Sequence, residues 1–145
     1  MKGMKFGGTS LANWQRFSAA AAIVADTAKI ESVAVVLSAP ATVTNGLLEV
    51  VDLAIKGDDF TAVLADIELV FNNLYQGASS VLTPPQFSLL MEKLTVQLNF
   101  WEKKLLGISL LNECPDFVRA EVLVVGEKLS SQLMVQLMIA KDLSS

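Results

Sequence analysis

The sequence predicts an α/β protein with an incomplete, mainly parallel sheet and a helix-rich second half. Two observations lead to this prediction. The first third of the chain alternates strand, helix, strand and helix patterns, which is typical of parallel strands joined by crossover helices. The remaining two thirds carry apolar residues at helical spacing and offer no further secure strand. Since parallel strands need neighbours at their edges and cover on both faces, the sheet is expected to be only part of a larger one.

The first strand and the turn after it open the chain. Residues 1–6 are expected to form a short strand, which Gly3 weakens because glycine gives a strand no side chain to pack. Residues 7–10 form a turn. Thr9 or Ser10 is placed to cap the following helix.

A helix, a strand and a second helix follow. Apolar residues recur at helical spacing over about residues 11–29, which predicts a helix. The valine-rich run at residues 33–37 is typical of a strand that is buried on both faces. Residues 38–44 are expected to be a loop, and residues 45–55 a helix.

The second half is predicted to be helical. Helices are expected at residues 61–75 and 85–106, separated by a break at residues 77–84. A last helix is predicted at residues 117–141, where apolar residues again have helical spacing. Residues 121–125 leave a strand open as an alternative, because valine favours strands.

Composition excludes several classes of protein. The chain has 145 residues, which suits one domain or part of a larger one, and its net charge is −4 without a basic stripe, so a nucleic-acid partner is not expected. The absence of histidine excludes a histidine base and histidine metal ligands within this chain. A single cysteine, Cys114, excludes an internal disulfide and fits a reducing, cytoplasmic location.

The apolar content points to burial against a partner and not to a membrane. Hydrophobic residues make up 52% of the chain, so further chain or a homo-oligomer partner is expected to cover part of this surface. No membrane partner is expected, because the most apolar run, residues 19–25, is far shorter than the roughly 20 residues needed to span a bilayer.

The strongest candidate site lies between the first strand and the first helix. Gly7 and Gly8 allow a phosphate to approach the backbone closely, and N–H groups at a helix start attract anions. Lys5 is placed to stabilise a transferring phosphoryl group as the catalytic cation, and Thr9 and Ser10 add hydroxyl donors. The alternative is a plain tight turn followed by a helix cap.

The second candidate site follows the second strand. Ligands of open α/β sheets gather outside the carboxyl ends of the strands, where this loop and the Lys5 loop are both expected. Thr44 and Asn45 offer hydrogen bonds to the carboxylate or amine of an amino acid. Either residue is also a common helix cap, which is the alternative interpretation.

A third candidate is Glu127, which follows Gly126 in an apolar segment. Its carboxylate suits a substrate ammonium group. The alternative is a surface glutamate paired with Lys128 or Lys103.

These segments together resemble a known family. KFGGTS at residues 5–10 resembles the signature of the aspartate kinases, in the amino-acid kinase family. SAPATVTN at residues 38–45 resembles their second motif, in which many members have glycine where this chain has Thr42. GISLLNECPD at residues 107–116 and the SAPA form are similar to the bacterial bifunctional aspartokinase I–homoserine dehydrogenase I group, and the glycine–glutamate pair at residues 126–127 resembles the family's GE motif.

The resemblance implies transfer of phosphate from ATP, with Mg²⁺, to the side-chain carboxylate of L-aspartate, giving 4-phospho-L-aspartate. This reaction opens the route to lysine, methionine and threonine. Lys5, Gly7 and Gly8 would contact the transferring phosphate, and Ser10 and Ser38 would lie near the phosphates.

By the same resemblance, Thr44, Asn45 and Glu127 would form the aspartate side of the site, and no metal ligand is assigned. Residues 1–145 would be the N-terminal portion of a catalytic domain with a partial amino-acid kinase fold. The nucleotide lobe, the regulatory ACT domains and the dehydrogenase would lie beyond it, so this chain is expected to be an inactive fragment. A different amino-acid kinase, or a non-catalytic helical module that dimerises or binds a partner, remains an alternative.

Overall fold

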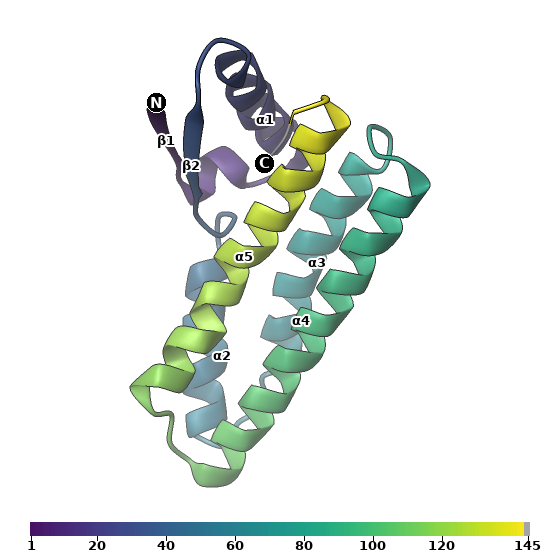
Figure 1. Ribbon diagram of the computed structural model, residues 1–145. Coiled ribbons are helices and arrows are strands. Elements are labelled where there is room, and N and C mark those ends of the chain that lie inside the picture. The colour runs from purple at the N-terminus through teal and green to yellow at the C-terminus, as the bar shows by residue number, and fades with distance from the viewer. Residues whose placement is uncertain (144–145) are drawn as a thin grey trace.

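The computed structural model describes residues 1–143, which form a two-stranded sheet, a short 3₁₀ helix and five α-helices (Figure 1). In chain order the elements are β1 (Lys2–Phe6), η1 (Gly8–Leu11), α1 (Trp14–Ala28), β2 (Val33–Leu37), α2 (Val43–Ile55), α3 (Thr61–Ala78), α4 (Pro84–Leu111) and α5 (Asp116–Ala140). The order strand, helix, strand, helix in the first third, followed by helices alone, confirms the predicted fold class.

The two strands are parallel, as predicted. Their register pairs Lys2 with Val33 and Phe6 with Leu37, so both strands end at the same edge. The Ser38 N–H donates to the Phe6 carbonyl oxygen at 3.1 Å and carries the pairing one residue further. The loops that follow β1 and β2 therefore leave the sheet side by side.

The prediction that β2 is buried on both faces is wrong for this part of the chain. Val36 is 61% exposed and Ala34 is also exposed. Val35 and Leu37 point to the other side, where they line a groove with α1 and α5. A valine-rich run indicates a strand, but its second face is buried only where something covers it.

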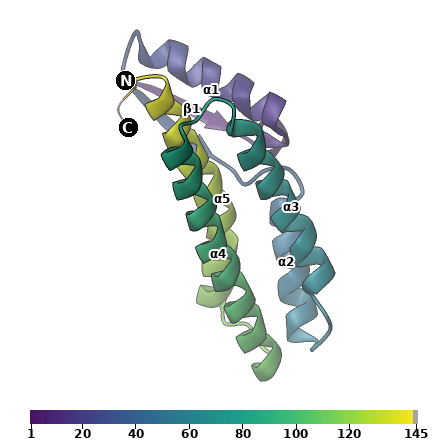
Figure 2. The same cartoon turned by 90° about the vertical axis from the view of Figure 1, so that its right-hand side faces the viewer.

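A helical core fills the rest of the molecule. In Figure 2, α1 lies across the end of the long helices that run down from the sheet. Trp101 of α4 is fully buried, and its Nε1 donates to the Val122 carbonyl oxygen of α5 at 2.9 Å. Tyr75 of α3 donates its hydroxyl to the Leu129 carbonyl oxygen of α5, also at 2.9 Å, and burial raises the pKa of this phenol. Helix α5 is thus held from two sides.

The start of α1 differs from the sequence prediction. Asn13 caps α1 by accepting from the Arg16 N–H at 2.9 Å, so the predicted cap at Thr9 or Ser10 is wrong. Both of those residues lie in η1 instead. The start of α4 follows the prediction more closely, because Thr83 begins a capping box just before Pro84.

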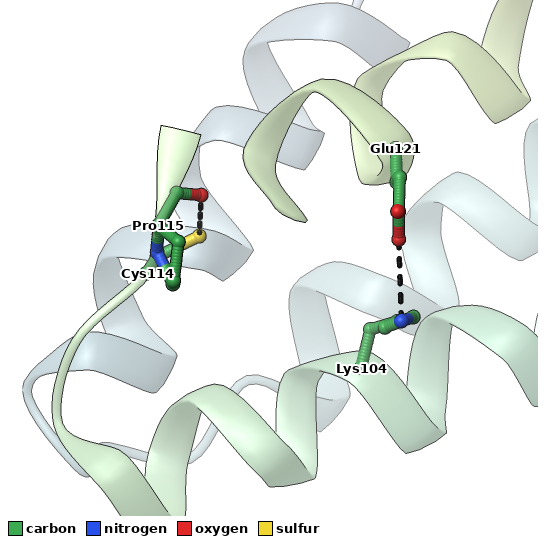
Figure 3. Close-up of polar contacts among 4 residues, drawn as sticks. All are labelled: Lys104, Cys114, Pro115 and Glu121. Atoms are coloured by element: carbon green, nitrogen blue, oxygen red, sulfur yellow. Dashed lines mark hydrogen bonds and ion pairs between the residues drawn. The ribbon is translucent and has the colours of Figure 1, made fainter. Parts of the chain in front are cut away.

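Helix α5 forms as predicted, which rules out the alternative of a strand at residues 121–125. By length and composition it could cross a membrane, yet 56% of its most apolar 18-residue stretch is buried inside the molecule. At its first turns, Glu121 forms an ion pair with Lys104 of α4 at 3.2 Å (Figure 3). Such exposed pairs contribute little to stability, so packing determines where α5 lies.

Candidate functional site

The loops after the two strands contact each other directly. The first loop (residues 7–10) follows β1, and the second loop (residues 38–42) follows β2. The Ala41 N–H donates to the Gly8 carbonyl oxygen at 2.9 Å. A Cβ at Gly8 would lie only 3.0 Å from the Ala39 carbonyl oxygen and 3.2 Å from the Ala41 nitrogen, so glycine allows this close approach. A Cβ at Gly7 would meet nothing within 4 Å, which leaves that side of the first loop open.

The second loop also contacts α5. A Cβ at Gly126 would lie 2.9 Å from the Ala39 Cβ and 3.2 Å from a methyl carbon of Val43, so glycine lets α5 approach the loop closely. Glu127 follows Gly126 directly and is exposed. Ala39, in the second loop, therefore lies close to both Gly8 of the first loop and Gly126 of α5, so the three sequence motifs meet around it.

Several backbone N–H groups at this edge have no acceptor. Within residues 1–143, the N–H groups of Gly8 and Thr9 at the start of η1 donate no hydrogen bond to a backbone acceptor. The same holds for Thr44 and Asn45 at the start of α2, whose N-cap side chain makes no capping bond. Helix starts of this kind attract anions, and here two of them follow neighbouring strands.

Thr44 and Asn45 are not helix caps, so that alternative is wrong. Helix α2 begins at Val43, two residues before the predicted start, and Thr42 is the N-cap residue. Thr44 and Asn45 lie in the first helical turn with exposed side chains. Their side chains and free N–H groups are thus available to a ligand at the same place.

Thr42 has a backbone conformation that favours glycine. Its φ is 73°, in the left-handed region, where a β-branched side chain is strained. This is the position at which many members of the resembled family have glycine. The conformation thus gives a physical reason for the glycine of the motif.

We expect Thr42→Gly to raise the free energy of unfolding by about 1 kcal/mol, because glycine relieves the left-handed strain and gives back only part of the gain as backbone entropy. Urea unfolding followed by circular dichroism measures the change. Thr42→Ala is the matched control, since alanine keeps the Cβ that is strained in this conformation and should stabilise the chain less than glycine does. Equal stability of the glycine variant and the wild type would contradict this account.

Charged side chains flank the loops. Lys5 is exposed at the end of β1, next to Val36 of β2. Arg16 donates from Nη1 to the Thr9 carbonyl oxygen at 3.3 Å and places a second cation beside the first loop. Arg16 was not among the residues predicted for the site. The available signal was a cation in the first turn of the α-helix that follows the glycine loop.

Glu127 is a surface residue, as the alternative interpretation held, but it is not paired as that interpretation held. Among the described residues it makes no ion pair with Lys103 or Lys128. Its carboxylate is therefore open to a cationic ligand group.

The remaining predicted residues lie at the same edge of the sheet. Ser10 is exposed within η1, and Ser38 is half-buried directly after β2. Within residues 1–143 no group of three or more His, Cys, Asp or Glu side chains gathers in a way that could hold a metal ion. The arrangement offers backbone donors and cations for an anion, and one carboxylate for a cationic group.

Comparisons with known proteins identify relatives that match nearly the whole chain. The model of the amino acid kinase family matches residues 4–145. Two curated relatives are each named bifunctional aspartokinase/homoserine dehydrogenase. The one from Buchnera aphidicola is 32% identical over 98% of this chain, and the one from Haemophilus influenzae is 35% identical over 92%. The chain spans 17% and 16% of the lengths of these relatives.

Solved structures share the fold. Escherichia coli aspartokinase III in complex with lysine and aspartate superposes with a TM-score of 0.82 at 23% identity, covering 99% of this chain and 30% of that one. The same enzyme in complex with aspartate and ADP gives a TM-score of 0.81 at 24% identity, covering 98% and 29%.

Proposed function

The chain belongs to the amino acid kinase family, and from this premise we propose that it is the N-terminal portion of an aspartate kinase catalytic domain. In the complete enzyme this portion would help transfer phosphate from ATP to the side-chain carboxylate of L-aspartate. The names of the curated relatives support this substrate, as does the aspartate bound in the similar solved structures.

One observation carries the proposal. Two helix starts with free N–H groups, at Gly8–Thr9 and Thr44–Asn45, follow the ends of paired strands, and Lys5 lies at one of those ends. Phosphoryl transfer needs positioning and charge stabilisation more than it needs a base, so a chain without histidine can support it.

On the phosphate side, Lys5 is proposed to stabilise the charge of the transferring phosphoryl group. Gly7 and Gly8 would leave room for its oxygens. The N–H groups and the hydroxyls of Thr9 and Ser10 would orient the phosphate chain. Ser38, at the end of β2, would lie near the same phosphates.

On the amino-acid side, Thr44 and Asn45 are proposed to hold a carboxylate of aspartate with their N–H groups and side chains. Glu127 would bind the α-ammonium group, to which its carboxylate is complementary. Gly126 brings Glu127 close to the second loop, since it lets α5 lie against that loop.

The nucleotide is proposed to be ATP, in keeping with the ADP bound in one similar structure. Its phosphates fit the free N–H groups and Lys5. Mg²⁺ is usually held by one or two carboxylates together with phosphate oxygens. Within residues 1–143 no cluster of acidic side chains gathers that could hold it.

The isolated chain is proposed to lack turnover, because it spans 17% of a relative that carries two activities in its name. A homo-oligomer and a cytoplasmic location remain predictions. The comparisons do not favour the alternative of a non-catalytic helical module.

A chimeric enzyme tests the function. In it, this chain replaces the matching 142 residues of the Buchnera relative, whose own aspartokinase activity is the control. Phosphorylation of L-aspartate, trapped as the hydroxamate, is the expected result. A folded chimera that leaves aspartate unmodified would contradict the proposal, as would preference for glutamate or another acceptor.

Glu127→Gln in the chimera should raise the KM for aspartate about tenfold or more and change the KM for ATP much less, because the amide cannot pair with an ammonium group. Steady-state kinetics with each substrate varied in turn measures both constants. Glu113→Gln, an exposed acid beyond the end of α4, is the matched control. Equal effects on both substrates would remove Glu127 from the ammonium site.

A further inference from the structure

An apolar groove lies between the end of α4 and the start of α5, at the far end of these helices from the sheet (Figure 1). Its volume is about 610 Å³. Leu111 and Phe117 line it and are 71% and 67% exposed, and Leu110 beside it is 85% exposed. Residues 107–116, which resemble the bifunctional aspartokinase group, supply much of the lining and play no part in the proposed function. Exposed apolar patches of this kind mark interaction surfaces.

Gly107 lines this groove, and no neighbour within residues 1–143 accounts for a glycine there. Glycine inside a helix is less stable than alanine. The other helical glycines have a reason, because a Cβ would lie 3.0 Å or less from another side chain at Gly46, Gly77 and Gly126. A Cβ at Gly107 would meet nothing within 4 Å. A second molecule that packs closely against this face would account for the missing side chain.

The same face carries a projecting side chain and two opposite charges. Lys103, Gly107 and Leu110 follow one another at i, i+4 and i+7 spacing, so they share one face of α4. Lys103 and Glu113 both line the groove, the first about two turns before the end of α4 and the second just beyond that end. Both are exposed and form no ion pair within residues 1–143. The surface therefore offers a knob beside a hole, and a positive end opposite a negative end.

A second copy of the chain fits this face, because a twofold axis brings its complementary features together. When two identical helices pack antiparallel across such an axis, residues equally far on either side of it face each other. An axis that passes α4 at Ile108 places Lys103 of one copy opposite Glu113 of the other. An axis half a residue further along places Leu110 of one copy over Gly107 of the other. The two positions nearly coincide, so one axis serves both pairs.

We propose that this groove is the contact surface of a homodimer, in which Leu110 of each copy packs over Gly107 of the other and Lys103 pairs with Glu113. A partner of one charge would leave Lys103 or Glu113 without a counter-charge, whereas a second copy supplies both. The surface lies at the opposite end of the molecule from the two strands and their loops, so this inference does not rest on the proposed function (Figure 1).

Sedimentation equilibrium of the 145-residue chain tests the dimer. The wild type is expected to pass from 15.6 kDa to twice that mass as the concentration rises to about 1 mM. Leu110→Ser removes the knob and Gly107→Leu fills the hole, so each should raise the Kd of the dimer about tenfold or more. Both variants should keep the helical circular dichroism of the wild type, because Leu110 is exposed and the space above Gly107 is open.

Charge reversal identifies the twofold pairing. Lys103→Glu and Glu113→Lys should each raise the Kd about fivefold, because each places like charges opposite one another twice in the dimer. The double variant exchanges the two charges within every chain, so it should return to within about twofold of the wild-type Kd. Such a rescue requires that the two residues face each other across the interface.

Leu69→Ser is the matched control for Leu110→Ser, since Leu69 is a 56% exposed leucine of α3 outside this groove and should leave the Kd unchanged. A wild type that stays monomeric at about 1 mM would overturn the proposal and leave the groove to another partner. A dimer that Leu110→Ser and Gly107→Leu leave intact would also overturn it, as would a double charge variant no tighter than the single ones. These mass measurements need no substrate, so the dimer and the proposed function fail separately.

Discussion

Lys5→Ala in the chimera is expected to lower kcat about 100- to 1,000-fold, the usual effect of removing one group that stabilises charge in a transition state. The reason is positional. Lys5 is exposed at the end of β1, beside two helix starts whose first N–H groups donate to no backbone acceptor within residues 1–143. Because its effect is expected mainly in the transition state, the KM for aspartate should change little.

Two variants accompany this measurement. Lys2→Ala removes an exposed lysine at the opposite end of the same strand and should leave kcat within twofold of the wild type. Circular dichroism should show that both alanine variants unfold at the wild-type temperature, since neither lysine is buried. A Lys5→Ala enzyme with near-normal kcat would remove Lys5 from its proposed role.

Trp101→Ala is expected to destabilise the chain by about 3–5 kcal/mol, the range for removing a large aromatic side chain from a core. Trp101 is fully buried, packs 6.2 Å from the Phe71 ring between centroids, and donates to the Val122 carbonyl oxygen of α5. Domains are stable by only about 5–15 kcal/mol, so this variant should be largely unfolded or close to it. Urea unfolding measures the loss.

A graded series identifies the cause. Trp101→Phe keeps most of the packing and loses the hydrogen bond, so it should cost clearly less than the alanine variant. Phe117→Ala removes an aromatic side chain that is 67% exposed and should change stability by less than about 0.5 kcal/mol. Similar losses for Trp101→Ala and Phe117→Ala would show that burial at position 101 is not the cause.

Some features followed from local chemistry. The order of strands and helices and the span of β2 follow from residue types and their spacing, because apolar periodicity and β-branched residues act over a few neighbours. The glycine loop could be identified as a candidate site from the sequence for the same reason. Its two glycines and a lysine belong to one short segment, between a strand and a helix.

Other features depend on segments far apart in the chain. Helix α2 begins at Val43, directly after the left-handed Thr42, in a loop whose Ala41 N–H is bonded to the Gly8 carbonyl oxygen of the first loop. The exposed face of β2 has a similar cause. The valine run is the same whether or not another layer covers it, so burial could not be read from the run itself.

By itself, the sequence determined the class of fold, the strand order of its first third and the motifs that mark the family, since each depends on neighbouring residues. Only the tertiary structure decided that Gly8, Ala39 and Gly126 meet and that Thr42 holds a left-handed turn. These are contacts or conformations imposed by packing between distant segments, and no local pattern of residue types encodes such distances.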